Sequence, residues 1–316
     1  MRVFSAEDLD RTLDFPALID ELAEAMRGGF VAPHRHHHLV QRAGEPVATH
    51  LLMPAWTESA SRAGLYLGVK VVNVFPGNTA RGLSAVTGVY LLQSGRTGET
   101  LAVLDGTRLT HWRTAAASAL AARHLARTDA KSLLIVGAGA LAPYLARAHA
   151  SVRSYERIAL WNHRPEGARK LAARLAEFGL AATPTTDLEA AVAEADVVSC
   201  ATLATEPLIA GRWLKAGQHL DLVGAFSVSM READDEALRR AHIFIDTDAA
   251  LVEGGDVAAG VSGGVIDRSA VIADLPALCR GAPGRRRADE ITLFKSVGAS
   301  IEDLAAAQLV WRRVGG

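Results

Sequence analysis

The segment Ser132–Ala142 constrains the fold more than any other part of the sequence. It reads as an apolar strand, Ser132–Val136, that runs directly into the pattern Gly-x-Gly-x-x-Ala and then into a helix. In this pattern Gly137 makes the tight turn, Gly139 lets a pyrophosphate approach the backbone, and Ala142 allows close packing of helix on strand. A glycine-rich turn alone is weak support, but a second strand follows at the distance that a βαβ unit requires. The segment therefore predicts a dinucleotide-binding site.

The second predicted strand, Ile158–Trp161, bears on the choice of cofactor. A site selective for NAD commonly places an acidic side chain at the tip of this strand, where it binds the ribose 2′-hydroxyl. Here the residues that follow are Asn162, His163 and Arg164. Asn162 can bind the ribose, and Arg164 with His163 can bind a 2′-phosphate, although Arg164 as a solvated loop residue is the alternative. We expect NADPH, with NADH as the other possible cofactor.

The hydrophobic pattern divides the chain into two predicted domains. Residues 116–293 alternate short apolar strands with helices, and the strands lack the polar–apolar alternation of a sheet with one solvated face. We therefore expect an α/β domain of the Rossmann type there, with a doubly wound parallel sheet. Residues 1–115 and 294–316 are expected to form a second, α+β domain. A helix predicted at Ser300–Arg312 packs back onto the first lobe in this scheme.

Local patterns predict several elements of the α+β domain. Asp14 and Pro16 begin an amphipathic helix that continues to Met26. Ser300 and Asp303 fit a capping box at the start of the C-terminal helix. Strands are predicted at Val47–Met53, Ala63–Phe75, Ser84–Leu92 and Thr100–Asp105.

Composition narrows the possible partners and location. The formal net charge of -1 gives no general field for nucleic acid. No run of ~18 uncharged apolar residues is present and the N-terminal segment is charged, so we expect no membrane partner and a cytoplasmic location. Cys200 and Cys279 show no metal-binding or disulfide spacing. The histidines of His34–His38 would point alternately to opposite faces of a strand, so we expect no metal site.

Three basic residues stand in unusual contexts. Lys70 lies in the apolar strand-like segment Leu65–Val72, where a charge is costly unless it is paired or used. An edge-strand lysine that reaches solvent is the alternative. Arg113 directly precedes the predicted helix Thr114–Arg127, where an arginine beside exposed N–H groups binds a carboxylate or phosphate; an ordinary surface arginine is the alternative. Lys295, in the last predicted strand, fits structural support as well as a functional role.

Together these motifs resemble the ornithine cyclodeaminase/mu-crystallin family over nearly the whole chain. The segments that carry the resemblance are Gly68–Val72, Leu109–Ala116, Gly137–Ala142, Ala201–Pro207 and Thr292–Gly298. The resemblance implies a homodimer in which residues 1–115 and 294–316 form the substrate-binding and dimerisation domain. It also implies that Arg35, Lys70 and Arg113 surround the carboxylate of the substrate.

The expected cofactor site combines the local pattern with the resemblance. The glycine loop and the strand tip contribute Gly137, Gly139, Ala140, Leu141, Asn162, His163 and Arg164. The resemblance adds Thr87, Arg113, Thr114, Thr202, Gly224, Lys295 and Ser296.

One departure separates the chain from the cyclodeaminases of this family. Those enzymes carry an aspartate after the corresponding Leu-Val-Gly strand, where it serves the ring-closing amine chemistry, and Phe226 stands at that position here. Activation of the second amine of ornithine is hard to explain without a base. An apolar wall at Phe226 suits a small cyclic substrate.

The sequence around Phe226 also resembles a particular branch of the family. The run Asp221–Phe226, followed by Met230–Glu232, is similar to that of enzymes that reduce Δ1-pyrroline-2-carboxylate and Δ1-piperideine-2-carboxylate. The Asn162 loop is similar to that of the NADPH-dependent ketimine reductases, including mu-crystallin. Both features imply an oxidoreductase that reduces a C=N bond.

The expected activity is NADPH-dependent reduction of a cyclic ketimine carboxylate to L-proline or L-pipecolate. Lys70 is expected to be the catalytic residue at the imine, and Arg35 and Arg113 to bind the carboxylate beside Phe226. The alternatives are an ornithine cyclodeaminase with recycled NAD, an alanine-dehydrogenase-like amino acid oxidoreductase, and a crystallin-like protein that holds NADPH without turnover.

Overall fold

The computed structural model describes residues 1–58 and 64–315. The chain divides into two compact units: unit 1 comprises Met1–Thr114 and Ala299–Gly316, and unit 2 comprises Ala115–Gly298. The second boundary falls after Gly298 and not before Phe294, because β15 (Thr292–Lys295) pairs on both sides with strands of unit 2. No helix among the described residues is long and apolar enough to cross a membrane.

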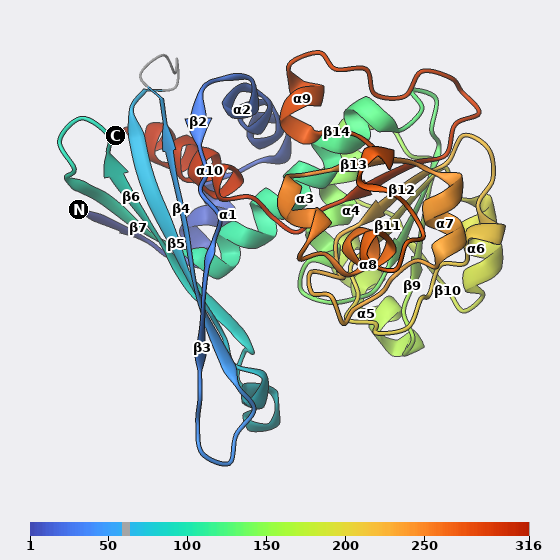
Figure 1. Cartoon of the computed structure of the whole chain (residues 1–316), viewed down its shortest axis with the longest axis horizontal. Helices are drawn as coiled ribbons and strands as arrows, with labels where there is room; N and C mark the ends of the chain where they lie inside the picture. Colours follow the sequence, from blue (N-terminus) through green and yellow to red (C-terminus); the bar gives the residue numbers. More distant parts are fainter. Residues whose placement is uncertain (59–63, 316) are drawn as a thin grey trace. The chain divides into compact units, whose positions relative to one another are not determined.

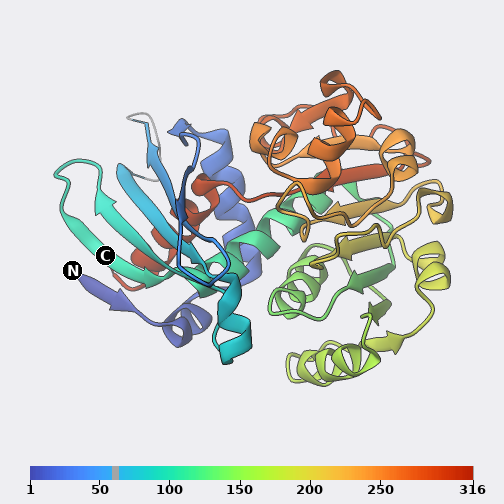
Figure 2. The same ribbon diagram turned by 60° about the horizontal axis from the view of Figure 1, so that its bottom comes forward.

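Unit 2 is built on an eight-stranded parallel sheet. Its other strands are β8 (Ser132–Val136), β9 (Arg157–Trp161), β10 (Thr183–Thr185), β11 (Val197–Cys200), β12 (His219–Leu222), β13 (His242–Ile245) and β14 (Val271–Asp274). The strand order is β10-β9-β8-β11-β12-β15-β13-β14, so the direction of winding reverses between β8 and β11. Helices lie on both sides of the sheet (Figure 2), and β8 is therefore buried along its whole length. The predicted doubly wound Rossmann-type fold is confirmed.

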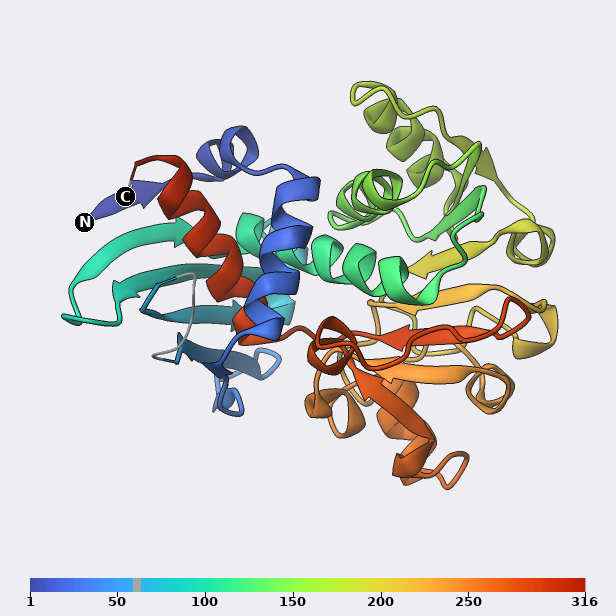
Figure 3. The same cartoon turned by 90° about the horizontal axis from the view of Figure 1, so that it is seen from above.

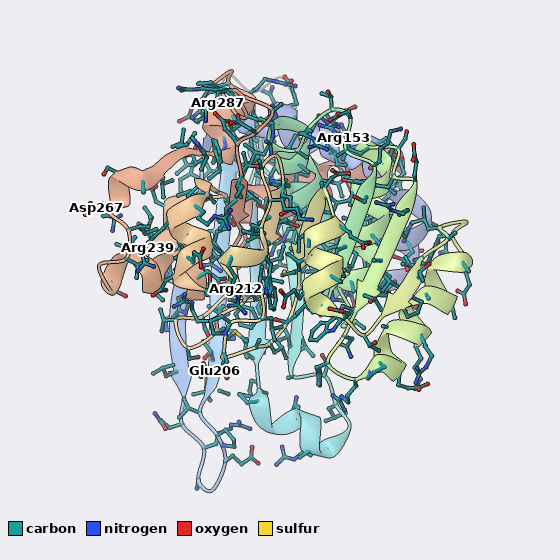
Figure 4. The ribbon with its side chains drawn as sticks, turned by 90° about the vertical axis from the view of Figure 1, so that its right-hand side faces the viewer. Arg153, Glu206, Arg212, Arg239, Asp267 and Arg287 are labelled. Carbon is teal, nitrogen blue, oxygen red and sulfur yellow. The ribbon has the colours of Figure 1, made fainter. Side chains whose placement is uncertain are left out.

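The helices of unit 2 follow the strands in alternation, as the crossover rule for parallel sheets requires. They are α4 (Ala142–Val152), α5 (Pro165–Ala176), α6 (Leu188–Glu194), α7 (Asp235–Arg240), α8 (Gly255–Ser262) and α9 (Leu275–Cys279), with short 3-10 turns at Gly211–Trp213, Asp248–Leu251 and Arg268–Ala270. Arg153, labelled in Figure 4, follows α4 and donates hydrogen bonds to the carbonyl oxygens of Arg127 at 3.0 Å and Ala126 at 3.2 Å. Arg153 Nη2 also donates to Ala122 O at 3.3 Å and to Arg123 O at 3.2 Å, which satisfies acceptors in the last turn of helix α3 (Gly106–Leu125).

Unit 1 contains a mixed, mainly antiparallel seven-stranded sheet. Its strands are β1 (Arg2–Phe4), β2 (Phe30–Val31), β3 (His36–Val40), β4 (Ala48–Thr57), β5 (Tyr66–Val74), β6 (Val86–Ser94) and β7 (Thr100–Asp105). The order is β1-β7-β6-β5-β4-β2, and β3 pairs with β4. Strands β3 to β6 continue as a long twisted ribbon (Figure 1).

Helices cover one face of the unit 1 sheet. They are α1 (Ala6–Thr12), α2 (Phe15–Arg27), α10 (Ser300–Arg313) and the first part of α3. A 3-10 turn at Pro76–Arg81 connects β5 to β6. Helix α10 packs on β4, β5 and β6 and against α2, and Figure 3 shows α10 beside α2 above the sheet. The expected packing of the C-terminal helix onto the first lobe is confirmed. Asp14 caps α2 by accepting from Ala17 N, and Pro16 lies in the first turn as predicted.

Three local predictions differ from the structure. Helix α3 begins at Gly106, so Arg113 lies inside the helix and not beside its N-terminus. The predicted capping box at α10 is wrong, because Ala299 is the N-cap residue without a side-chain hydrogen bond and the Asp303 side chain is buried in ion pairs. The predicted strand Ala63–Phe75 starts at a residue outside the described ones, and the observed β5 begins at Tyr66.

Candidate functional site

A cavity of about 720 Å³ lies at the carboxyl ends of strands β8, β9 and β11 in unit 2. The switch in strand order between β8 and β11 falls at the same place. Open α/β sheets bind their ligands at such a point, outside the carboxyl ends of the strands. The lining residues are Gly137, Ala138, Gly139, Trp161, Asn162, His163, Arg164, Glu166, Gly167, Lys170, Ala201, Thr202, Leu203, Ala204 and Leu208.

The glycine loop of this cavity fits a dinucleotide. Gly137 has a φ of +105°, and a Cβ there would lie 2.7 Å from Ala201 O, so only glycine makes this turn without strain. A Cβ at Gly139 would meet no atom within 4 Å, so the backbone is open to an incoming group. Helix α4 begins just beyond, and Leu141 at its N-cap offers no side-chain hydrogen bond. Uncapped N–H groups at a helix start stabilise an anion such as a pyrophosphate.

The tip of β9 supplies positive charge to the cavity. Asn162 Nδ2 donates to Arg164 O at 2.8 Å, and Arg164 Nε donates to His163 Nε2 at 3.1 Å. Lys170, one turn further along α5, also lines the cavity. Glu166, the acidic member of the lining, is paired with Arg169 at 2.7 Å. These basic side chains can donate hydrogen bonds to an anionic group in the cavity.

The structure gathers part of the predicted cofactor set around this cavity. Gly137, Gly139, Asn162, His163, Arg164 and Thr202 line it. Ala140 and Leu141 follow the glycine loop directly. Gly224, Lys295 and Ser296 are buried in unit 2 and are not among the lining residues, although Gly224 packs directly against the lining residue Thr202. Thr87, Arg113 and Thr114 belong to unit 1.

Glu232 is a buried residue beside the cavity to which sequence reasoning assigned no role. Its Oε1 accepts from Thr202 N at 2.7 Å and Thr202 Oγ1 at 2.9 Å, while its Oε2 accepts from Gly224 N at 2.7 Å and Ala225 N at 3.2 Å. Burial raises the pKa of this carboxyl group although Lys295 opposes the shift. Glu232 thereby fixes the loops after β11 and β12 to one another. The only sequence signal was its place in the run Met230–Glu232.

A second buried network lies at the end of β15. Lys295 Nζ is 3.2 Å from Asp256 Oδ2, and Asp256 Oδ1 accepts from Glu232 N at 2.8 Å. Ser296 Oγ donates to Asp246 Oδ2 at 3.1 Å. Both contacts hold the segment after β15 in place. The contacts of Lys295 and Ser296 are those of residues that stabilise the fold. For Lys295, such a structural role was one of the two expectations from the sequence.

A charged cluster in unit 1 contains two of the three basic residues that were predicted to bind the substrate. This cation cluster consists of Lys70, Arg113, Glu302 and Asp303. Lys70 Nζ lies 2.9 Å from Asp303 Oδ1 and 2.8 Å from its Oδ2. Arg113 donates from Nε to Asp303 Oδ1 at 3.1 Å and from Nη1 to Glu302 Oε2 at 2.6 Å.

Burial decides how these cations behave. Lys70 is 2% exposed and Arg113 is 5% exposed, so the solvated alternatives for both residues are wrong. Helix α10 covers the face of β5 from which the Lys70 side chain projects, which explains why Lys70 is buried. Burial, followed by the Arg113 charge, lowers the pKa of Lys70 from 10.5 to about 8, while the Asp303 and Glu302 carboxylates oppose the shift. An ammonium of this pKa can donate a proton near neutral pH.

The remaining predicted residues are more exposed. Arg35 directly precedes β3 in unit 1 and is partly exposed. Thr87 lies on β6, where it pairs with Asn73 of β5. Phe226 follows β12 in unit 2, and 48% of it is exposed.

Comparison with known proteins places the chain among its relatives. The sequence profile of the ornithine cyclodeaminase/mu-crystallin family matches residues 8–316. A Δ1-pyrroline-2-carboxylate reductase of Paracoccus denitrificans is 40% identical over 299 residues, covering 94% of this chain and 93% of that protein.

Solved structures agree with this assignment over the full length. The Δ1-pyrroline-2-carboxylate reductase of Thermococcus litoralis, in complex with NADH and L-proline, superimposes with a TM-score of 0.92 at 32% identity, covering 99% of this chain and 97% of that one. An archaeal alanine dehydrogenase dimer with bound NAD gives a TM-score of 0.89 at 28% identity and covers 99% of this chain and 96% of the other. The chain belongs to the ornithine cyclodeaminase/mu-crystallin family.

Proposed function

We propose that this chain is a nicotinamide-dependent oxidoreductase that reduces a cyclic ketimine carboxylate. The substrates are Δ1-pyrroline-2-carboxylate or Δ1-piperideine-2-carboxylate, and the products are L-proline or L-pipecolate. The observation that carries the proposal is the cation cluster, in which a buried lysine and a buried guanidinium share the Asp303 carboxylate. The relatives named as Δ1-pyrroline-2-carboxylate reductases support the same chemistry.

Each residue has a defined task in this proposal. A bound dihydronicotinamide would supply the hydride, which C2 of the imine accepts. The electron pair of the C=N bond moves to nitrogen, and nitrogen takes a proton from the Lys70 ammonium. Lys70 is left as a neutral amine and regains its proton from water. Arg113 and Arg35 hold the substrate carboxylate, and Phe226 provides an apolar wall against the ring.

We propose NADPH as the preferred cofactor. Arg164 and His163 follow β9 where an NAD-selective site would carry an acidic residue, and Lys170 adds a third basic group to the lining. A 2′-phosphate beside these groups gains charge-assisted hydrogen bonds that a ribose hydroxyl cannot match. The bound NADH and NAD of the solved relatives make NADH the comparison cofactor for every assay.

We also propose that two copies of the chain associate through the unit 1 sheet. Because Lys70 faces α10, its neighbours Val69 and Val71 face the opposite side of the sheet. Val71 pairs with Val89, which is 43% exposed, and Trp56 on the same sheet is 40% exposed. A half-exposed apolar sheet face of this kind is typical of an obligate interface, and the alanine dehydrogenase relative is a dimer.

The test of the activity measures NADPH oxidation by the purified protein. Each cyclic imine is supplied separately, and parallel samples contain L-ornithine, assayed for ammonia, or pyruvate with ammonium. Rapid NADPH loss with a cyclic imine, and no ammonia from ornithine, is the expected result. Ammonia release from ornithine without net NADPH loss would overturn the proposal in favour of a cyclodeaminase. Preference for pyruvate with ammonium would overturn it in favour of an alanine-dehydrogenase-like enzyme.

A further inference from the structure

Asp303 contacts both cations of the cation cluster. Its Oδ1 accepts from Lys70 Nζ at 2.9 Å and from Arg113 Nε at 3.1 Å, and its Oδ2 lies 2.8 Å from Lys70 Nζ. The Asp303 side chain is fully buried. Glu302, the neighbouring carboxylate, bonds Arg113. Both acidic residues of α10 therefore bind Arg113, and Asp303 also binds Lys70.

Lys70 is surrounded by groups of opposing effect. Arg113, on α3, repels the ammonium, whereas Asp303 and Glu302, on α10, attract it. Thr110 of α3 accepts a hydrogen bond from Lys70 Nζ at 3.2 Å. From β6, Tyr90 is the cross-strand neighbour of Lys70 and stays neutral, because burial and then Asp303 raise the pKa of its hydroxyl well above the usual value. Without Asp303, the Lys70 ammonium would lose its two largest stabilising interactions, and the weaker attraction of Glu302 would remain to oppose burial and the Arg113 charge.

We propose that Asp303 is a positioning residue that keeps the buried Lys70 side chain protonated and aimed between Arg113 and the substrate imine. This inference rests on the proposed function for its catalytic meaning. The interaction itself, in which the Asp303 carboxylate stabilises the protonated form of Lys70, is a property of the protein without substrate. Lys70 and Arg113 share the Asp303 carboxylate. A substrate carboxylate that neutralises Arg113 would therefore strengthen the interaction between Asp303 and the Lys70 ammonium.

The effect of Asp303 on the protonation of Lys70 can be measured without any assay of activity. The chain has five lysines, so selective 13C labelling of lysine gives few signals, and a Lys70→Ala sample assigns the one of interest. In Asp303→Asn we expect the proton affinity of Lys70 to fall at least tenfold, seen as a lower midpoint in the NMR titration. The matched control Glu302→Gln should give a smaller change. An unchanged Lys70 titration in folded Asp303→Asn would overturn the proposal.

A second variant covers the case in which Asp303→Asn does not fold. Arg113→Gln removes the competing cation, so Asp303 serves Lys70 alone and the Lys70 midpoint should rise. A midpoint that stays in place in this variant would show that the carboxylate is not shared and would overturn the proposal.

The kinetic readout separates this inference from the proposed function. If the wild-type protein reduces the cyclic imine, Asp303→Asn should lose kcat/KM at a lower pH than wild type, with the Kd for NADPH unchanged. An equal loss at every pH would mean that Asp303 only packs the helix, and would overturn the positioning role. If the wild-type protein reduces no imine, the proposed function fails, while the NMR titration still decides the role of Asp303.

Discussion

Lys295 Nζ lies 3.2 Å from Asp256 Oδ2, and neither side chain is exposed to solvent. The two residues come from β15 and α8, and Asp256 also accepts a hydrogen bond from Glu232 N. A fully buried ion pair adds little net stability, because desolvation offsets the attraction, but loss of one partner leaves a buried charge without compensation. Removal of one partner of the pair is therefore expected to lower the stability far more than the intact pair raises it.

Replacing Lys295 by methionine should lower the free energy of unfolding by about 3–5 kcal/mol. The measurement is urea unfolding followed by circular dichroism. The matched control is Lys215→Met at an exposed position, where we expect a change within about 0.5 kcal/mol. Adding Asp256→Asn to Lys295→Met should recover part of the loss. A Lys295→Met protein as stable as the control would show that the buried charge is satisfied in another way.

The two glycines of the cofactor loop should respond differently to alanine. At Gly139 a methyl group meets no protein atom within 4 Å, so thermal stability should stay the same. The methyl group would occupy the space a pyrophosphate needs, so affinity for NADPH should fall at least about tenfold. At Gly137 the positive φ and the 2.7 Å approach to Ala201 O should destabilise the fold itself, by about 1–2 kcal/mol or more.

Thermal melting and a fluorescence titration of NADPH separate these two outcomes. Equal loss of stability in Gly139→Ala and Gly137→Ala would mean that Gly139 also makes a structural turn. Normal NADPH affinity in Gly139→Ala would place the pyrophosphate elsewhere.

Arg164→Ala should distinguish the two nicotinamide cofactors. A hydrogen bond to a charged group contributes about 1.5–3 kcal/mol, so the KM for NADPH should rise roughly 10- to 100-fold. The KM for NADH, which lacks the 2′-phosphate, should change little. Arg169→Ala is the matched control, because Arg169 lies on α5, which follows Arg164 directly, and pairs with Glu166. Equal effects on NADPH and NADH would assign Arg164 to the shared part of the two cofactors.

The pH dependence of kcat/KM should follow Lys70. The ammonium form is the proton donor, so kcat/KM should stay level below a pH of about 8 and fall as pH rises through the pKa of Lys70. Lys70→Arg keeps the positive charge but cannot give up its proton, so kcat should fall by roughly 100-fold or more while NADPH affinity is retained. A wild-type profile that stays level well above this pKa would remove Lys70 from the donor role.

The parts of the fold that local patterns determine were predictable from the sequence. The glycine loop, the buried parallel strands and the amphipathic helix α2 each depend on residues close together in the chain. The strands β1, β2 and β3 were not predicted, since β1 and β2 are very short and the histidines of β3 hide its alternation. The start of α3 was missed because Gly106 and Thr107 are weak helix formers.

The cation cluster depends on contacts between residues far apart in the chain, which local sequence patterns do not predict. Lys70 was singled out because a charge in an apolar strand is costly, and Arg113 because an arginine beside a helix N-terminus can bind a carboxylate or phosphate. Their partner Asp303 lies 233 positions from Lys70 in the chain, and its spacing from Ser300 fitted a local capping box equally well. Similarly, Glu232 is needed by the loops after β11 and β12, which meet only when the parallel sheet has formed. The roles of Asp303 and Glu232 therefore depend on tertiary contacts.

Helix α10 brings the carboxylates to two cations that are translated much earlier, on β5 and α3. During synthesis the ribosome makes Lys70 and Arg113, then the whole of unit 2, and only then Glu302 and Asp303. Until α10 is synthesised, Lys70 and Arg113 have no carboxylates from that helix beside them, and burial of their two positive charges is unfavourable. Unit 1 is therefore expected to complete its folding last, and a chain cut short before α10 would present an unfinished lobe to cellular proteases.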